Sequence, residues 1–206
     1  ALKPTASTTT FMQGLTAANV RNNGATIDTA GFNVTVGQVL QHSVINGDSF
    51  IDGGLKKNGN GNLTLSATNT YRGNTAVNGG TLTLAGTGSI TNSRNIAVAS
   101  GALFDVSAVA GGFTLGGVQT LSGSGTINGA VSNIGTISPG TGVGDIGTLT
   151  FNNPLVMNGT NSLEVSRNSG MLTNDQIELP SSGLTYGGTL KVASIGEPLQ
   201  AGDAFQ

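Results

Sequence analysis

The chain has 206 residues, including 34 Gly but no Cys or Trp, and its formal net charge is −2. The lack of Cys excludes disulfides and thiolate metal sites, and the lack of excess positive charge argues against nucleic acid as a partner. Charged residues make up 9% of the chain, which is far below the usual share of about a quarter and argues against a compact helical enzyme. The many Val, Ile, Leu and Thr residues favour a folded β-structure over disorder.

The two ends of the sequence predict a piece of a longer, exported protein. No run of about 18 apolar residues occurs, so no membrane-spanning helix is expected. Residues 1–4 lack the apolar core of a signal peptide, and residues 201–206 form no polar cap. We therefore expect residues 1–206 to be one continuous segment of a protein that is secreted or displayed on a bacterial surface, with its secretion signal elsewhere.

Along the chain, short units of an apolar, a polar and an apolar residue recur between turns of Gly, Asn, Ser and Asp. No window of 11 or more residues carries uninterrupted helical spacing of apolar positions, so almost no helix is expected. In each unit the outer residues should face a core and the middle residue should face solvent. The units are Leu63–Leu65, Leu82–Leu84, Phe104–Val106, Phe113–Leu115, Leu149–Phe151, Leu163–Val165 and Leu190–Val192.

The intervals between these units predict a solenoid. Leu63 and Leu82 are 19 residues apart, Leu82 and Phe104 are 22 apart, and the interval from Leu163 to Leu190 is 27. Such intervals are typical of one coil of stacked short strands. The predicted fold is all-β, a single-stranded parallel β-helix of roughly ten coils, on the order of 50 Å long. An antiparallel sandwich normally needs more aromatic core residues, and a β-propeller would show a period of about 40 residues.

Residues 53–84 carry the most specific pattern in the chain. It reads Gly-x-Leu-x-Lys-x-Gly-x-Gly-x-Leu-x-Leu and continues with Asn-x-Tyr-x-Gly-x-Thr-x-Val-x-x-Gly-x-Leu. The segment resembles the autotransporter-associated β-strand repeat, also called the passenger-associated transport repeat, found in autotransporter passenger regions. The matching positions are Gly53, Leu55, Lys57, Gly59, Gly61, Leu63, Leu65, Asn69, Tyr71, Gly73, Thr75, Val77, Gly80 and Leu82.

This resemblance implies a right-handed parallel β-helix that is displayed at, or released from, the cell surface. It also implies that the repeat assists passage across the outer membrane. The sequence holds one good copy of the repeat rather than an array. Independently of the resemblance, Gly59 and Gly61 are expected to allow positive φ at a sharp corner between two faces.

Three polar residues before the repeat are candidates for chemistry. His42 is the sole His, and it has no acid or second ligand at a characteristic spacing, so it is predicted to be a surface or loop residue. Asp48 and Asp52 could pair as acid and base or bind calcium, as carboxylates of polysaccharide lyases on this fold do. Because both neighbour Gly, ordinary turns are the favoured interpretation.

Two further patterns are predicted to have no chemical role. Residues Gly142–Gly147 match the dinucleotide motif G-x-G-x-x-G, but a strand rather than a helix is expected to follow them. Thr81 with Thr83, and Thr148 with Thr150, resemble the hydroxyl pairs of ice-binding solenoids. The equivalent pairs on other coils are expected to be Asn62 with Thr64, Leu103 with Asp105, and Ser162 with Glu164. No flat array results, so solvated strand faces are predicted, and no catalytic residue, cofactor or metal site is expected.

The predicted function is that of a non-catalytic extracellular rod for display, with adhesion as an added role carried by loops such as 107–112 and 168–175. The expected partners are a second copy of the chain or a host or environmental glycan or protein. One alternative is a self-assembling fibre subunit joined through its end coils. Another is a polysaccharide-degrading enzyme, which would need carboxylates and Arg or Lys converging in a groove.

Overall fold

The computed structural model describes residues 1–180 and 184–205, and within these ranges the chain forms strands and turns but no helix. The expectation of an all-β chain with almost no helix is confirmed. Eight strands form the first sheet: β1 (Thr8–Met12), β4 (Val34–Val36), β7 (Asn62–Leu65), β9 (Thr81–Leu84), β11 (Leu103–Asp105), β14 (Thr126–Asn128), β17 (Thr148–Phe151) and β21 (Gln176–Glu178).

The remaining strands of the described ranges form a second sheet, a third sheet and one separate pair. The second sheet contains β3 (Ala25–Asp28), β6 (Leu55–Asn58), β8 (Thr75–Val77), β10 (Asn95–Val98), β13 (Thr120–Gly123), β16 (Thr136–Pro139), β19 (Thr160–Asn168) and β20 (Met171–Asn174), with β23 (Thr189–Gly196) beside β19. The third sheet contains β12 (Phe113–Leu115), β15 (Val131–Asn133), β18 (Leu155–Met157) and β22 (Leu184–Tyr186), and the separate pair is β2 (Ala18–Val20) with β5 (Leu40–His42).

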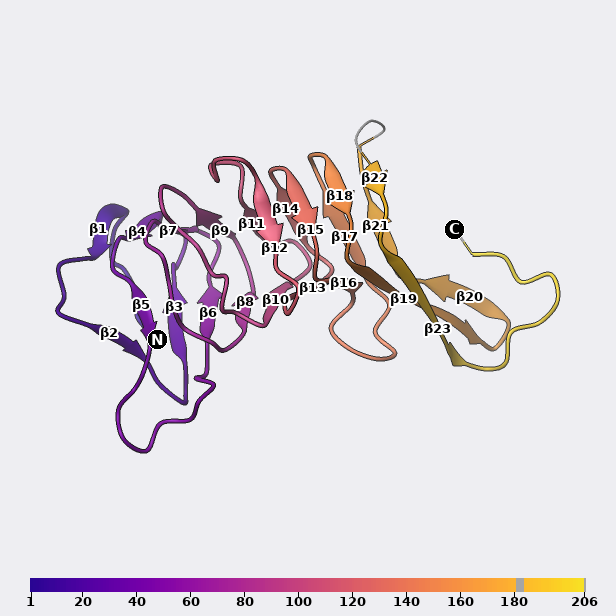
Figure 1. Ribbon diagram of the computed structural model, residues 1–206, viewed down its shortest axis with the longest axis horizontal. Helices are drawn as coiled ribbons and strands as arrows, with labels where there is room; N and C mark the ends of the chain where they lie inside the picture. The colour runs from indigo at the N-terminus through magenta and orange to yellow at the C-terminus, as the bar shows by residue number, and fades with distance from the viewer. Residues whose placement is uncertain (181–183, 206) are drawn as a thin grey trace.

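The chain visits the sheets in rotation, so consecutive strands never pair with each other over most of its length. From β12 to β19 it passes through the third, second and first sheets in repeating order, and each strand pairs in parallel with the strand one circuit later. Figure 1 shows the resulting layers side by side along the long axis of the molecule. This is solenoid-like parallel stacking. Antiparallel pairing in the described ranges is confined to β19 with β20 and a bridge between Gly123 and Gly140.

The core is built from apolar residues that face inward at the same register position of successive layers. Period-2 alternation in each short strand sends one set of side chains inward and leaves Thr, Asn or Ser on the outer face. One such ladder, fully buried, runs through the first sheet in the order Val34, Leu63, Leu82, Phe104, Ile127 and Phe151. Stacking therefore pairs the backbone groups of neighbouring layers and buries their aliphatic side chains together.

The region after residue 160 departs from this regular pattern. Strand β19 is nine residues long and extends beyond the layer below it, where it pairs with β20 and β23 (Figure 1). The expectation that Leu190 and Val192 face a core is wrong, because both are more than half exposed on β23. The expectation of a loop at 168–175 is also wrong, because most of these residues belong to the β19–β20 hairpin.

No helix in residues 1–180 and 184–205 has the length and apolar character needed to cross a bilayer.

Candidate functional site

The residues that match the transport repeat lie on four consecutive strands, β6 to β9, and on the turns between them. The side chains of the non-glycine members face inward, and all of the matching residues are buried except Gly53, Gly59 and Gly80, which are half-buried. The apolar members occupy the ladders of the core, as expected for a solenoid layer. The polar members Lys57, Asn69, Tyr71 and Thr75 are also buried, so each needs hydrogen-bond partners inside the stack.

Lys57 connects three successive layers at one corner. In the second sheet it occupies an inward position between Ile27 of β3 and Val77 of β8, and its side chain is fully buried. Its ammonium group donates to the hydroxyl of Thr29 (3.0 Å) in the preceding layer and to the carbonyl of Gly79 (2.8 Å) in the following layer.

Within its own layer, Lys57 donates to the carbonyls of Asn58 (3.1 Å) and Gly59 (2.6 Å). Burial lowers the pKa of Lys57 from 10.5 to about 8, although the nearby carboxylate of Asp28 opposes the shift. The side chain therefore supplies a donor to the turn carbonyls of Gly59 and Gly79, whereas the carbonyl of Asn58 also accepts from the backbone N–H of Thr29 (2.9 Å).

Asn69 connects layers in the same way at a second corner. Its Oδ1 accepts a hydrogen bond from the backbone N–H of Leu40 (2.9 Å), which lies one layer earlier. Its Nδ2 donates to the carbonyl of Ala67 (2.8 Å) in the same turn and to the carbonyl of Ser89 (3.1 Å) one layer later. The amide side chain thus adds to the backbone hydrogen bonds of this turn, in which the N–H of Asn69 donates to Ser89 (3.1 Å) and the N–H of Thr70 donates to Leu40 (3.0 Å).

A short chain of hydroxyl groups lies inside the stack between these corners. The hydroxyl of Tyr71 is 2.6 Å from Oγ1 of Thr75, which in turn is 2.9 Å from Oγ of Ser93 in the next layer. All three side chains are buried, and burial raises the pKa of Tyr71, with the hydrogen bond to Thr75 opposing this. The repeat therefore supplies three separate polar connections between layers.

The two corner glycines of the repeat are needed for different reasons. The expected positive φ is confirmed at Gly59, where φ is 77°, but it is wrong for Gly61. At Gly61 space is limiting, because a Cβ atom would overlap the backbone carbonyl of Phe32 in the preceding layer. Close stacking of two backbones at this corner thus requires a residue without a side chain.

Replacing Gly61 with Ala is expected to lower the free energy of unfolding by about 1–3 kcal/mol, because the two layers must separate to admit the methyl group. Gly79→Ala is the matched control. A Cβ at Gly79 would lie 3.6 Å from the carbonyl of Gly59, an ordinary contact, and little change is expected. Urea unfolding followed by far-ultraviolet circular dichroism measures both variants, and equal midpoints would contradict the assignment.

His42 and Asp52 form a buried pair that the sequence patterns did not predict. Nδ1 of His42 is 2.8 Å from Oδ2 of Asp52, and neither side chain is a free surface group. Asp52 also accepts hydrogen bonds from the backbone N–H groups of Arg72 (2.8 Å), Gly73 (2.9 Å) and Gly54 (2.9 Å). Asp52 is therefore the centre of a turn that joins two layers, rather than an ordinary exposed turn residue.

The carboxylate of Asp52 is stabilised in its ionised form by these contacts. Burial alone would raise its pKa, but the hydrogen bonds from Arg72, His42, Gly73 and Gly54 outweigh burial and hold the pKa below 3.8. Asp48 has other partners, since it accepts from Nε of Arg21 (2.8 Å) and from the hydroxyl of Ser43. The two carboxylates thus do not share a partner. Among the described residues, no three His, Asp or Glu side chains are grouped to hold a metal ion.

Residues Gly142–Gly147 form a surface loop between β16 and β17, with no helix after them. The loop is held by carboxylates of the following layer, because Gly144 donates to Glu164 (2.7 Å) and Gly147 donates to buried Asp175 (2.8 Å). The literal match to a dinucleotide motif therefore lies in a strand–loop–strand context, which lacks the helix N-terminus that a phosphate group needs.

The Thr pairs lie on the outer face of the first sheet, in register with other polar residues. Thr81 and Thr83 follow Asn62 and Thr64, and they precede Leu103 and Asp105, as expected. The placement of Ser162 and Glu164 in this series is wrong, because they belong to β19 of the second sheet. Hydrogen bonds link neighbours along the face, such as Thr83 with Asn62 (3.0 Å) and Asn128 with Asp105 (3.0 Å). The mixed side chains give a solvated face.

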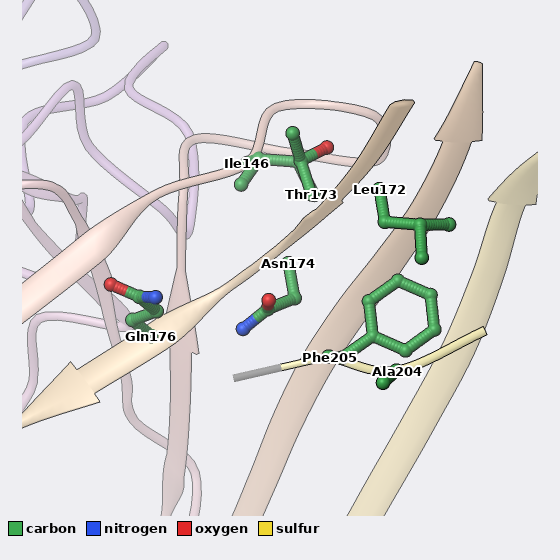
Figure 2. A pocket seen from close by; sticks show the side chains of 7 residues that line it. All are labelled: Ile146, Leu172, Thr173, Asn174, Gln176, Ala204 and Phe205. Carbon is green, nitrogen blue, oxygen red and sulfur yellow. The ribbon is translucent and has the colours of Figure 1, made fainter. Parts of the chain in front are cut away.

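A cavity of about 480 Å³ lies beside the β19–β20 hairpin, where an adhesive loop was expected. Figure 2 shows the ring of Phe205 next to Leu172 of β20, with Ile146 and Thr173 across from them. Apolar and amide side chains line the cavity, and they include no carboxylate or cation. This arrangement offers packing contacts without groups for acid–base chemistry.

Comparison with known proteins supports the pattern found in the repeat. Residues 55–91 match the family model described as the passenger-associated transport repeat. Over 154 residues, or 70% of the chain, the sequence is 35% identical to the protein named adhesin BmaC autotransporter, from Brucella suis biovar 1 (strain 1330). The chain spans about 4% of the length of that relative. No solved structure matches the chain. The two matches indicate a secreted or surface-displayed protein.

Proposed function

Because the chain is an autotransporter passenger region that carries a transport repeat, we propose that it is a non-catalytic extracellular rod for display. In this proposal the parallel stack is a right-handed β-helix of roughly ten coils that runs through residues 1–206, and residues 53–84 assist secretion. The observation that carries the proposal is that two buried polar residues of the repeat bond to both neighbouring layers. Lys57 and Asn69 each join three consecutive layers.

These connections suit a chain that folds layer by layer as it reaches the cell surface. A solenoid gains stability from contacts between nearest neighbours, so a layer that is already folded can template the next one. Buried donors that wait for carbonyls of the following layer make that step specific, since only the correct register satisfies them. Each added layer would then oppose backward movement of the chain through a narrow pore.

Asn69→Ala, introduced into the full autotransporter that contains this chain, tests the role in secretion. We expect several-fold less passenger at the cell surface, because the substitution removes the side-chain hydrogen bonds from this turn to the layers before and after it and leaves the N–H of Leu40 without this acceptor. Asn78→Ala is the control, since Asn78 is exposed on the same repeat and its side chain donates to the side chain of Asn58 (2.8 Å). Protease accessibility on intact cells, divided by the total amount made, gives the surface fraction. Equal fractions for the two variants would refute the secretion role.

Adhesion is the second part of the proposal, and the name of the adhesin relative supports it. The absence of catalysis is likewise proposed, with support from how the candidate groups are used. Asp52 and Lys57 are committed to backbone partners inside the stack, so neither is placed to act on a substrate. A partner is expected among host or environmental glycans and proteins.

A further inference from the structure

The loop between β5 and β6, residues 43–54, holds several apolar side chains in solvent. Val44 is 89% exposed and Phe50 is 71% exposed, and Ile45 and Ile51 are also exposed. In Figure 1 this segment projects away from the stacked layers. Four exposed apolar side chains in one loop make this segment a candidate surface for contact with another molecule.

Polar contacts at its base fix the shape of this loop. Asp48 is bound by Nε of Arg21 (2.8 Å) and by the hydroxyl of Ser43, and the N–H of Ser49 donates to Asn22 (2.7 Å). At the other end of the loop, Asp52 accepts its four hydrogen bonds from neighbouring turns. The exposed side chains are thus presented by a preorganised frame, which reduces the entropy lost when a partner binds.

Beside the loop lies a groove of about 340 Å³ on the outer face of the second sheet. Its floor is formed by Ala76 of β8 and Ala97 of β10, which are adjacent in register, with Lys56 of β6 next in the same row. On one side of the two Ala residues the row continues to the long side chain of Lys56, and on the other side it continues to Ser122 and Ser138. Ile51 and the amides of Asn74 and Asn95 also line the groove.

Lys56 lines the groove, and Arg72 and Arg94 directly precede Gly73 and Asn95, which also line it; in the described part of the chain none of these three cations forms an ion pair. Lys3, Arg21 and Arg167 form ion pairs with Asp28, Asp48 and Asp203, whereas Lys56 and Arg94 are exposed and make no side-chain bond to any described residue. The guanidinium of Arg72 lies over the ring of Phe50, 4.2 Å from its centroid, and Nη1 donates to the carbonyl of Phe50 (3.3 Å).

The nearby carboxylate offsets only part of this positive charge. Asp52 lines the groove and is kept ionised by its hydrogen bonds from backbone N–H groups and His42, so it sets one negative charge against Lys56, Arg72 and Arg94. A local positive potential therefore remains on a chain whose net charge is −2.

We propose that this groove binds an acidic oligosaccharide, with uronate or sulfate groups at Lys56, Arg72 and Arg94 and a sugar ring against Phe50 and Ile51. The amides of Asn74 and Asn95 suit sugar hydroxyls, which both donate and accept hydrogen bonds. The inference rests on the adhesive part of the proposed function and names its ligand class.

Other ligand classes fit the groove less well. Strands β6, β8 and β10 are paired on both sides, so a peptide has no open strand edge to join. Nucleic acid normally needs several aromatic platforms for its bases, whereas no aromatic residue lines the groove and Phe50, which neighbours the lining residue Ile51, is already covered by Arg72.

The charge requirement is tested by titrating the purified chain with a heparin-derived hexasaccharide and an oligogalacturonate, using maltohexaose as the neutral probe. Lys56→Gln combined with Arg94→Gln should weaken binding of an acidic probe by at least about tenfold, since two charge contacts are lost. Lys3→Gln combined with Lys191→Gln removes the same charge elsewhere and should leave binding nearly unchanged. Equal weakening by both pairs, or equal binding of maltohexaose, would overturn the proposal.

The shape requirement is tested with Ala97→Leu, which fills the floor of the groove from an outward position and should abolish binding. Ser138→Leu, on the outer face of β16, is the control and should bind like the parent chain. Stronger binding of an acidic peptide or of single-stranded DNA than of the acidic glycans would refute the ligand class.

Cell adhesion measured with the same variants separates the two proposals. Adhesion without any binding of acidic glycan would overturn the groove assignment alone. Groove-dependent binding of the glycan without adhesion would overturn only the adhesive role.

Discussion

Replacing Lys57 with Ala is expected to lower the free energy of unfolding by about 3–5 kcal/mol, although Lys is rarely a core residue. The side chain is fully buried between Ile27 and Val77, so truncation leaves a cavity in the ladder. It also removes the hydrogen bonds to the carbonyls of Gly59 and Gly79, and each buried carbonyl left without a donor costs about 1–3 kcal/mol.

The neighbouring Lys56 provides the control, because it lies on the same strand but points outward into solvent. Lys56→Ala should change the free energy of unfolding by less than about 0.5 kcal/mol. Lys57→Met should restore the packing but not the hydrogen bonds. Its free energy of unfolding should therefore lie between those of Lys57→Ala and Lys56→Ala. Urea unfolding measures all three, with hydrogen exchange of β3, β6 and β8 locating the effect. A Lys57→Ala variant as stable as Lys56→Ala would show that the layer connection contributes nothing.

Lys57 also gives the stability a characteristic dependence on alkaline pH. Its pKa is lowered to about 8 in the folded chain from 10.5, so between these values the unfolded chain binds one more proton than the folded chain. The free energy of unfolding should therefore rise with pH from about 8, by up to about 1.4 kcal/mol per pH unit. Tyr71, whose pKa is raised, acts in the opposite direction once unfolded Tyr ionises near pH 10. The range from pH 8 to 9.5 is therefore the informative one, and Lys57→Met should lack the rise.

Much of the fold could be predicted from the sequence because a solenoid repeats one local rule. The alternation that begins at Leu55 places Lys57 on the inward side by parity, and the recurring units locate the core ladders. The same rule failed at Leu190 and Val192, since alternation says which residues share a face but not whether another layer covers that face. The short apolar–polar–apolar units do not indicate where a strand such as β19 continues beyond its layer.

The polar connections were harder to predict because their partners are distant in sequence. Asn69 bonds to Leu40 and Ser89, and Lys57 bonds to Thr29 and Gly79, so each connection depends on the register between layers. The pair of His42 and Asp52 was missed for a similar reason. Two Gly after Asp52 suggested a turn, correctly, but the turn is buried against Arg72 and Gly73 of the next layer. Turn composition alone does not report such burial.

Replacing Asp52 with Asn is expected to lower the free energy of unfolding by about 3 kcal/mol at neutral pH. The carboxylate accepts from three backbone N–H groups and from His42, whereas an amide of the same shape offers one accepting oxygen and turns its NH₂ toward the other donors. At least one buried N–H of Gly54, Arg72 or Gly73 then faces a donor instead of an acceptor. Glu178→Gln, the same chemical change at an exposed residue, should cost less than about 0.5 kcal/mol.

The pH dependence of this variant separates the charge of Asp52 from its shape. Because the folded pKa lies below 3.8, the ionised carboxylate stabilises the fold above that value, and this contribution is lost as the pH falls through the folded pKa. The difference in free energy of unfolding between the parent chain and Asp52→Asn should therefore shrink as the pH falls below 4. Other carboxylates titrate equally in both proteins and cancel in this difference. A difference that stays constant down to pH 2.5 would mean that the turn requires the shape of Asp52 but not its charge.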